Sequence, residues 1–581
     1  MRAPSRPAER RYTVSGHAAS PGLRCAAGLA AWLALPAAWS DNAAAGRELF
    51  RQQCTLCHGA EPGDGGGGQG PRLGGLYGRP AAQSPGFGYS NALRSAGITW
   101  DARTLDRFLA SPTGTVPGTA MAMSVARADD RLKLIAYLES QQQQAPASGS
   151  PAARAGRHAG LADWRTDAPG RLHRIDIATL PPPYASPSAT NSPRLVRKPR
   201  FARLQVPRGF KVGVFAGMVP GPRALRTAPN GDVFVSETHA GRIVVLRPSS
   251  DGTRAAQESV YAQGLGGPFG LAFYPPGDHP EWLYVAETNR IVRFHYAAGD
   301  QLAQQEPEVV VPKLSPNGTY GHSTRDLAFS PDGRRMYVSV GSASNVAQDM
   351  PRKMPGEIRD WEDRHGLGAA WGNEEYRADV LVYDTAAPQQ ARVYASGLRN
   401  CVSLTVEPTS GDLWCTTNER DALGDDLVPD YSTRVVDGGF YGWPWYYMGR
   451  YEDPRHRDER PDLAGKALVP DVPYQAHSAP LSLVFYDTSA GASAFPREYL
   501  GDGFAVLHGS WNRSVRTGHK VVRVRMKDGL PTGEYEDFLV GFIVDDHSAW
   551  GRPVGATVAS DGSLLISDDG ADLIYRISYR R

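Results

Sequence analysis

The sequence has no excess of either charge, and its N-terminal apolar run is short. Its 63 basic and 61 acidic residues give a net charge of +2 over 581 residues. This balance provides no strongly basic surface for nucleic acid or an anionic membrane. The apolar run CAAGLAAWLAL is too short to cross a bilayer as a stable anchor. We therefore expect no nucleic-acid partner and no stable membrane anchor.

Cysteine is scarce, with five residues in the whole chain. Cys54 and Cys57 are separated by two residues in RQQCTLCHGA and are followed directly by His58. This pattern is typical of covalent haem attachment, with the thiols bonded to the haem and the histidine bound to iron. Zinc would need two more thiolate or imidazole ligands, and a redox motif would need a βαβ context. Both are missing from the surrounding segment, so the motif predicts one haem c.

The N-terminus resembles an export signal. Arginines are scattered ahead of the apolar run, and PAAWS offers small residues for cleavage near Ser40. Thioether-linked haem is assembled outside the bacterial cytoplasm, so the haem motif and the leader agree. We expect a signal peptide over residues 1–40 and a periplasmic protein. The pair Arg10-Arg11 does not fix the export route.

Composition divides the remaining chain into three parts. Residues 42–143 carry helical patterns at both ends, in AAGRELFRQQC and DRLKLIAYLES. Residues 144–200 are rich in Gln, Ala, Pro, Ser and Gly, which is a linker composition followed by a proline-rich approach segment. Residues 201–581 form the largest part.

A loose repeat runs through residues 201–581. Segments such as ALRTAPNGDVFVSET, DLAFSPDGRRMYVSVGS and GATVASDGSLLISDDG each indicate a strand, a turn and a second strand. Strand pairs that recur every ~45–80 residues predict blades stacked around an axis. The predicted fold class is multidomain, with a small all-α domain followed by an all-β, six-bladed β-propeller. A β-sandwich, or two smaller β domains, is the alternative.

The haem iron needs a sixth ligand, and residues 42–143 offer two methionines, Met121 and Met123. VPGTAMAMS resembles the Pro-Gly-Thr-x-Met loop of class I cytochromes c, which implies Met121 as the ligand. GPRLGGLYGRPA and the segment around LIAYLES resemble the same family. A thioether ligand raises the reduction potential, which suits an electron acceptor.

Basic residues recur directly ahead of the expected inner strands of the blades, which places them on one face of a propeller. Converging arginines would be costly unless an anion neutralised them, and arginine binds carboxylates through paired hydrogen bonds. The pattern therefore predicts a polyanionic ligand. These positions are Arg223, His322, Arg325, Arg399, Asn400, His477 and Arg552, joined from a loop by Arg513.

The region from 201 to 579 resembles the soluble glucose/sorbosone dehydrogenases that depend on pyrroloquinoline quinone (PQQ), a tricarboxylate, and it is pyranose dehydrogenase-like. YGHSTRDLAFSPDG, GLRN, TTNERDALGDDLVPDY and HGSWNR carry the resemblance. It implies that His322 is the general base for a substrate hydroxyl, because an imidazole with a pKa of about 6.5 suits this task. Arg399 and Asn400 would contact the quinone, with Arg399 stabilising charge on it as a second catalytic residue. Arg513 would lie over the cofactor, and Arg552 would bind a carboxylate.

Two further sets of ligands are expected. Arg223 and Arg325 are assigned to PQQ from their position alone. The family holds Ca²⁺ mostly through main-chain carbonyl groups, which implicates Glu419 and Arg420 of TTNERD.

The sequence thus predicts an exported quinohaemoprotein dehydrogenase that oxidises a sugar or a sugar-derived aldehyde. Electrons would pass to the attached haem and then to a cytochrome, an oxidase or a quinone. GLGGPFG replaces a segment in which glucose-oxidising members carry glutamine, and His477 falls near a threonine position, so the substrate stays open. The alternatives are a calcium-dependent lactonase-type propeller, or a non-catalytic ligand-binding propeller with an electron-shuttling cytochrome. The lactonase ligands would be Glu237, Asn418 and Asp568.

Two local features have more than one interpretation. Cys401 and Cys415 flank one expected hairpin and could form a disulfide in an oxidising compartment, although their register looks offset. The aromatic segment GGFYGWPWYY could pack between blades or stack against a substrate.

Overall fold

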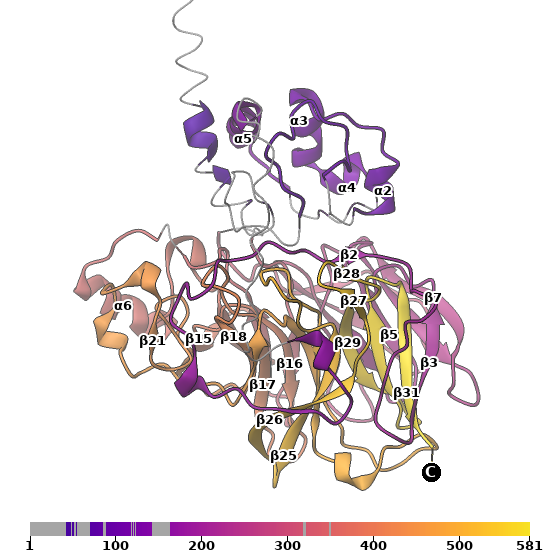
Figure 1. Cartoon of the computed structure of the whole chain (residues 1–581). Coiled ribbons are helices and arrows are strands. Elements are labelled where there is room, and N and C mark those ends of the chain that lie inside the picture. Colours follow the sequence, from indigo (N-terminus) through magenta and orange to yellow (C-terminus); the bar gives the residue numbers. More distant parts are fainter. Residues whose placement is uncertain are drawn as a thin grey trace, which may run out of the picture.

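The computed structural model describes most of the chain in two units, which Figure 1 shows as a group of helices and a larger group of strands. The expected signal peptide, Cys57 and Met123 lie outside the described residues. None of the described helices is long and apolar enough to span a membrane. The described residues are 42–47, 49–50, 54, 58, 70–84, 89–117, 119, 121, 124–141, 163–317, 321–347 and 350–580.

The smaller unit is mainly helical. Its longest described helices, α3 and α5, pack against each other around a core that includes Phe50, Trp100 and Phe108. The Asp101 side chain accepts a hydrogen bond from the Thr104 amide and so caps α3. An isolated β-bridge joins residues 80 and 99. The helical segments are residues 42–47 and 49–50, α2 (Asn91–Arg94), α3 (Ala102–Ala110), α4 (Pro112–Thr115) and α5 (Ala128–Ser140).

The larger unit contains, within the described residues, six sheets of four or five strands. The second strand of each sheet is almost wholly buried and contains an apolar run of at least three residues, as in VFVSE and LLISD. A strand covered on both faces needs no polar side, which explains this pattern. The first three sheets contain β4 (Leu225–Thr227), β5 (Val233–Glu237), β6 (Arg242–Pro248) and β7 (Ala255–Gln263); β8 (Leu271–Tyr274), β9 (Trp282–Ala286), β10 (Ile291–His295) and β11 (Glu308–Val311); and β12 (Leu327–Phe329), β13 (Arg335–Val340), β14 (Asp379–Asp384), β15 (Arg392–Ser396) and β19 (Gly439–Phe440).

The other three sheets follow the same antiparallel order, and the last sheet takes its outer strand from the beginning of this unit. Phe210 of β3 pairs with Tyr579 of β31, which ties the two ends of the unit together. These sheets contain β16 (Cys401–Val406), β17 (Leu413–Thr417), β18 (Pro429–Arg434) and β22 (Val472–Ala476); β23 (Pro480–Phe485), β24 (Gly503–Leu507), β25 (Lys520–Lys527), β26 (Leu530–Leu539) and β1 (Leu172–His173); and β29 (Pro553–Val558), β30 (Leu564–Asp568), β31 (Leu573–Tyr579) and β3 (Phe210–Gly217).

The first strands of the six sheets contact one another in a closed ring, in the order β4, β8, β12, β16, β23, β29 and back to β4. This arrangement is consistent with a β-propeller. Residues that directly precede these strands therefore gather at one end of the ring. Arg223, Arg325, Arg399 and Arg552 all hold such positions.

The proline-rich approach segment packs on the sheets from Asp163 onward. Its strand β1 joins β26, and its strand β2 (Arg194–Leu195) pairs with β28 (Ser548–Ala549), which also pairs with β27 (Ile543–Asp545). The Asn191 side chain donates hydrogen bonds to the carbonyl groups of Arg513 (3.1 Å) and Asp546 (2.8 Å). The segment thus braces loops at the end of the ring where the candidate residues lie. Its short 3₁₀ helices are η2 (Trp164–Thr166) and η3 (Ile177–Thr179).

A helical insertion and the aromatic segment form a further small core. Trp361 of α6 (Pro355–His365) packs in one cluster with Trp371, Phe440 and Trp445. Trp443 and Trp445 are almost fully buried, so packing accounts for GGFYGWPWYY. The remaining elements are β20 (Tyr446–Tyr447), β21 (Tyr451–Glu452), η4 (Gly372–Glu374), η5 (Pro454–His456), η6 (Pro461–Leu463) and η7 (Arg497–Tyr499).

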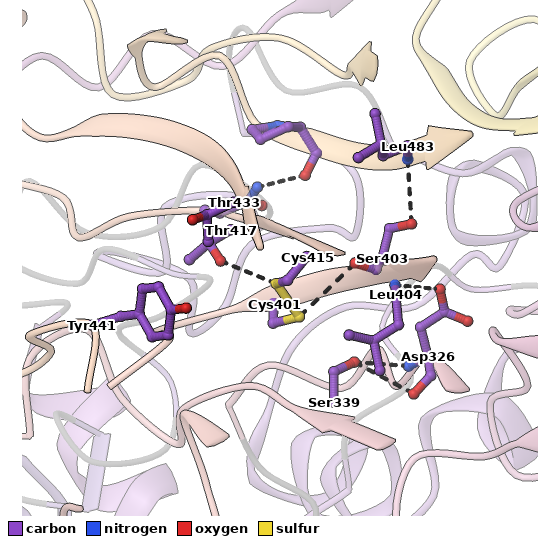
Figure 2. The surroundings of a disulfide bond; sticks show 12 residues. Asp326, Ser339, Cys401, Ser403, Leu404, Cys415, Thr417, Thr433, Tyr441 and Leu483 are labelled. Carbon is purple, nitrogen blue, oxygen red and sulfur yellow. Dashed lines mark hydrogen bonds between the residues drawn. A yellow bond between two sulfur atoms is a disulfide. The ribbon is translucent and has the colours of Figure 1, made fainter. Parts of the chain in front are cut away.

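Cys401 and Cys415 form a disulfide between β16 and β17, with 5.8 Å between their Cα atoms (Figure 2). The offset noted in the sequence is real, because Cys401 pairs with Thr417 and Cys415 with Leu404. A β-bulge between Cys401 and Ser403 accommodates it. Figure 2 also shows Asp326, whose carboxylate accepts a hydrogen bond from the Leu404 amide at 2.8 Å and so joins two sheets.

Candidate functional site

The helical unit holds His58 in the geometry of an iron ligand. The Nδ1 atom of His58 lies 2.8 Å from the carbonyl oxygen of Pro71, so Nδ1–H donates and Nε2 keeps its lone pair. Burial lowers the pKa of His58, which favours the neutral imidazole that binds metal. A side chain at Gly70 would lie 2.3 Å from the His58 ring, so glycine is required there.

Two other expected haem residues lie in the same unit. Cys54 is buried in the helical core, and Met121 packs against that core from its edge. The Met121 amide donates to the Thr119 hydroxyl at 3.5 Å within the PGT-x-M loop. Together with His58, these residues fit a covalent haem.

In the larger unit, His322 is buried and its ring is held from one side. Its Nδ1 atom lies 3.0 Å from both the carbonyl oxygen and the hydroxyl of Ser342. Burial, and next the charge of Arg399, hold the pKa of His322 well below its usual range. His322 is therefore neutral at neutral pH, with Nε2 as the proton acceptor.

Asn400 lies beside His322 across Gly341. A side chain on Gly341 would meet the Asn400 Oδ1 atom at 2.3 Å and the His322 Cβ atom at 2.7 Å. The Asn400 Oδ1 atom is buried and has no hydrogen-bond partner in the described structure. The structure thus brings together two residues that lie 78 positions apart, and it leaves a polar atom for a ligand.

Arg399 is almost fully buried and all of its N–H groups have acceptors. Its Nη1 atom donates to the carbonyl groups of Asn418 (3.2 Å) and Glu419 (2.8 Å), and its Nη2 atom contacts the Asp421 carboxylate at 3.1 Å. Its remaining donors bind the backbone and side-chain oxygens of Asn345. In this arrangement Arg399 positions the TTNERD loop.

Two more of the expected arginines gather around Asp569. The Arg223 Nη1 atom lies 2.6 Å from the Asp569 carboxylate, and Arg552 approaches the same carboxylate at 3.9 Å. His508 lies between Asp569 and Arg552, with its Nε2 atom 3.1 Å from the former and its Nδ1 atom 3.1 Å from the latter. The Arg552 side chain is the most open of these groups at 32% exposed.

The other two expected arginines have different surroundings. Arg513 pairs with Asp426 at 2.6 Å. Arg325 is fully buried and donates to the carbonyl groups of His322 and Thr324, but its Nε and Nη2 atoms have no partner in the described structure. Burial, followed by the charge of Arg377, lowers its pKa well below the usual range.

These ion pairs change the expectation that the converging arginines need an external anion to neutralise them. Four of the five arginines have carboxylate partners within the chain, so the uncompensated positive charge is smaller than expected. Two of the pairs join loops remote in sequence, since Arg223 and Asp569 are 346 positions apart and Arg513 and Asp426 are 87 positions apart. Arg325 alone lacks an acidic partner among the described residues.

One of the two carbonyl groups expected to bind calcium, that of Glu419, accepts a hydrogen bond from an arginine, and so does the neighbouring Asp421 carbonyl group. The Glu419 carbonyl accepts from Arg399, and the Asp421 carbonyl accepts from Arg455 at 2.9 Å and from the Asn345 amide at 3.2 Å. The Arg420 side chain points into a buried network with Glu419. Arg399 pairs with the Asp421 carboxylate and Arg455 with that of Asp453, so the positive charge of these two guanidinium groups is compensated there. The calcium site at the Glu419 and Arg420 carbonyl groups therefore stays a prediction.

His508, the histidine of HGSWNR, and Asp569, the residue after Asp568, were not assigned to one cluster from the sequence. The signal available was their place in loops after second strands. His477 also has no role assigned from the sequence. The His477 Nε2 atom lies 3.0 Å from the Gly424 carbonyl and its Nδ1 atom 3.5 Å from Asp421. Burial opposes protonation, but Asp421 outweighs it and raises the pKa of His477.

The fold and these sites define a c-type cytochrome joined to a ring of antiparallel sheets with a basic, histidine-containing site. The chain belongs to the TrAA12-like family, whose model matches residues 204–432 and 455–580. The cytochrome c model matches residues 43–142. The expected combination of a cytochrome c domain and a PQQ-dependent sugar dehydrogenase-like domain is confirmed.

Individual relatives match one unit or the other. An uncharacterized protein of Borreliella burgdorferi is 26% identical over 391 residues, which is 65% of this chain and 91% of that protein. Cytochrome c of Tetrahymena pyriformis is 46% identical over 100 residues, which is 17% of this chain and 88% of that protein.

Two solved structures share the fold of the larger unit. The holo PQQ domain of pyranose dehydrogenase from Coprinopsis cinerea is 20% identical, with a TM-score of 0.51, and the match covers 66% of this chain and 98% of that one. A calcium structure of the Trichoderma reesei AA12 enzyme is 19% identical, with a TM-score of 0.52, and the match covers 67% and 99%. At these identities the likeness concerns the fold alone.

Proposed function

We propose that this chain is a quinohaemoprotein dehydrogenase that oxidises a sugar or a sugar-derived aldehyde. In this proposal each of the six sheets is one blade of a propeller, PQQ binds at the end of the ring that carries His322, and haem c binds in the all-α cytochrome domain. The observation that carries the proposal is the neutral, oriented His322 beside Asn400, on the same chain as His58.

The orientation of the His322 ring suits it to remove a proton from the substrate. The Ser342 carbonyl holds the His322 proton on Nδ1, so Nε2 can accept the proton of a substrate hydroxyl. PQQ, when bound, supplies a carbonyl carbon that takes up the hydride from the substrate carbon. A hydrated aldehyde offers the same hydroxyl and hydrogen as a sugar, so both substrates fit this step.

The cofactor fits the residues in part. PQQ carries three carboxylates, and the partly exposed Arg552 guanidinium offers hydrogen-bond donors for one of them. The unpartnered Asn400 Oδ1 atom only accepts, so it suits an N–H or O–H group of the ligand. Arg223, Arg325, Arg399 and Arg513 add positive potential around the ring. The Glu419 and Arg420 carbonyl groups would hold Ca²⁺ in this proposal, and that of Glu419 also accepts a hydrogen bond from Arg399.

Within this chain, electrons from the quinone site pass to the haem of the cytochrome domain. His58 and Met121 would hold the haem iron, and a methionine ligand favours electron acceptance. A covalent linkage raises the effective concentration of the acceptor at the donor. A cytochrome, an oxidase or a quinone would then take the electrons from the haem.

We place the protein in the periplasm, exported by its N-terminal leader. The disulfide between Cys401 and Cys415 supports an oxidising compartment. Covalent haem attachment outside the bacterial cytoplasm supports the same location.

The lactonase alternative gains no support from the described residues. Glu237 is paired with Arg242, and the Asn418 amide donates to the Pro480 carbonyl. Asp568 accepts the amide of Arg552 at 2.7 Å. Among the described residues, the one cluster of metal-ligating side chains is Asp167, His173 and Asp537, and the Lys520 ammonium already contacts both of its carboxylates.

A direct assay tests the proposal. The haem-loaded protein is mixed with PQQ, and the haem absorbance is followed after addition of aldoses and aldehydes. Reduction of the haem by at least one of these compounds, only in the presence of PQQ, supports the proposal. Failure of PQQ to remain bound on dialysis, together with an unchanged haem spectrum, would overturn it.

A further inference from the structure

Four side chains from three sheets form one hydrogen-bonded cluster at the end of the ring. Arg223 precedes β4, His508 follows β24, Arg552 precedes β29 and Asp569 follows β30. Asp569 is the centre, since one oxygen contacts Arg223 at 2.6 Å and the other contacts His508 at 3.1 Å. Arg552 completes the cluster through its contact of 3.1 Å with His508.

The chemistry of the two partners fixes the state of the His508 ring. A guanidinium group only donates hydrogen bonds, so the His508 Nδ1 atom must accept from Arg552. A carboxylate only accepts, so the His508 Nε2 atom must carry the proton that it donates to Asp569. His508 is therefore a neutral imidazole with its proton on Nε2.

The electrostatics agree with this assignment. Burial, and next the charge of Arg552, lower the pKa of His508 to about 4. Burial would raise the pKa of Asp569, but His508 and Arg552 outweigh it and hold that pKa well below the usual range. At neutral pH the cluster contains two guanidinium cations, one carboxylate and one neutral ring, which leaves a net charge of about +1.

The cluster presents its positive end to a ligand. The Arg552 side chain is 32% exposed, whereas those of Arg223, Asp569 and His508 are about one tenth exposed. The Arg552 Nε atom is buried and lies 3.9 Å from an Asp569 oxygen, and its Nη2 atom donates to His508, so the inner side of the guanidinium faces the cluster. A partly exposed arginine that buried, hydrogen-bonded side chains hold in place is suited to bind the carboxylate of a ligand.

We infer that His508 and Asp569 are positioning residues that hold Arg552 in the orientation that binds a carboxylate of the quinone cofactor. This inference rests on the proposed function. Asp569 fixes the His508 tautomer, and the His508 Nδ1 lone pair then restrains the Arg552 guanidinium. Neither residue contacts the reacting atoms.

The test is a double-mutant cycle read by PQQ binding in equilibrium dialysis of the full-length, haem-loaded protein. His508→Leu removes both hydrogen bonds, and we expect it to weaken PQQ binding about tenfold. His508→Gln keeps an amide oxygen for Arg552 and an N–H for Asp569, so it should stay within about threefold of wild type. His365→Leu is the matched control, since His365 is similarly buried but lies in α6.

The cycle separates positioning from general loss of structure. If His508 acts through Arg552, His508→Leu has no further effect in an Arg552→Gln background. Equal weakening in both backgrounds, or unchanged binding by His508→Leu, would overturn the inference while the proposed function stands. Failure of the wild-type protein to bind PQQ would overturn both. The haem spectrum and the thermal midpoint of each variant verify folding.

Discussion

The Nδ1 atom of His322 lies 3.0 Å from the carbonyl oxygen of Ser342, and this contact determines which ring nitrogen carries the proton. A carbonyl oxygen only accepts, so the proton stays on Nδ1 and the Nε2 atom is the base. The same geometry holds the imidazole in place before a substrate arrives.

Replacement of His322 by alanine should lower substrate-driven haem reduction by about 10²- to 10⁴-fold, because the general base is lost. Stopped-flow absorbance of the haem measures this rate with PQQ and an active sugar. Reduction by dithionite should be unchanged, because it does not use the quinone site. The variant His365→Ala, which removes another buried histidine, serves as the control. A rate in His322→Ala close to that of wild type would exclude His322 as the base.

The rate should also stay nearly constant as the pH falls from about 8 to about 6, because His322 remains neutral over this range. An unperturbed histidine, with a pKa of about 6.5, would be mostly protonated at the lower limit. Burial and the charge of Arg399 lower the His322 pKa, so the loss of activity is displaced to lower pH. The measurement is the pH profile of haem reduction, corrected by the dithionite reaction. An inflection near neutral pH that depends on His322 would contradict the assigned protonation state.

Removal of calcium should change PQQ affinity by less than about threefold, because carbonyl groups of the TTNERD loop already accept hydrogen bonds from arginines within the chain. The Glu419 and Asp421 carbonyl groups accept hydrogen bonds from Arg399 and Arg455. Equilibrium dialysis of PQQ against EDTA-treated protein, with and without added Ca²⁺, measures this effect. Loss of PQQ binding in EDTA that Ca²⁺ restores and Mg²⁺ does not would show that calcium displaces these arginines.

The disulfide should stabilise the sheet that leads into the site. Cys401 directly follows Asn400, and Cys415 lies three residues before Asn418, so the bond ties together two segments of the site. The double variant Cys401→Ala and Cys415→Ala should lose about 2–4 kcal/mol of unfolding free energy, as expected for a loop of this size. Denaturant unfolding of the larger unit, followed by tryptophan fluorescence, gives this value. An unchanged midpoint, in a wild type shown by mass to be oxidised, would contradict a stabilising role.

The two units could be predicted from the sequence because their motifs are short and local. CTLCH, the PGT-x-M loop and the strand–turn–strand repeat each lie within a few tens of residues, and they led to the cytochrome c domain and the ring of sheets. The pairing of the arginines could not be predicted in this way. Arg223 meets Asp569 only because the ring brings the first and last sheets together, and no periodicity records that contact.

The approach segment shows a second limit of the sequence pattern. Its proline-rich composition indicates a linker, yet its strands β1 and β2 pair with the sheets. Each of these strands is only two residues long, which is too short to give an alternating pattern. Asn191 bonds to loop carbonyl groups, and such contacts depend on backbone position more than on the residue types of the loop.

The central claim is that one chain carries both the quinone site and the haem that receives its electrons. Haem reduction after addition of an active sugar to PQQ-loaded protein, measured over an about tenfold range of protein concentration, tests this claim most directly. Transfer within one chain predicts a first-order rate constant that does not change with protein concentration. A rate constant that rises in proportion to protein concentration, or a haem that stays oxidised while sugar is consumed, would contradict it.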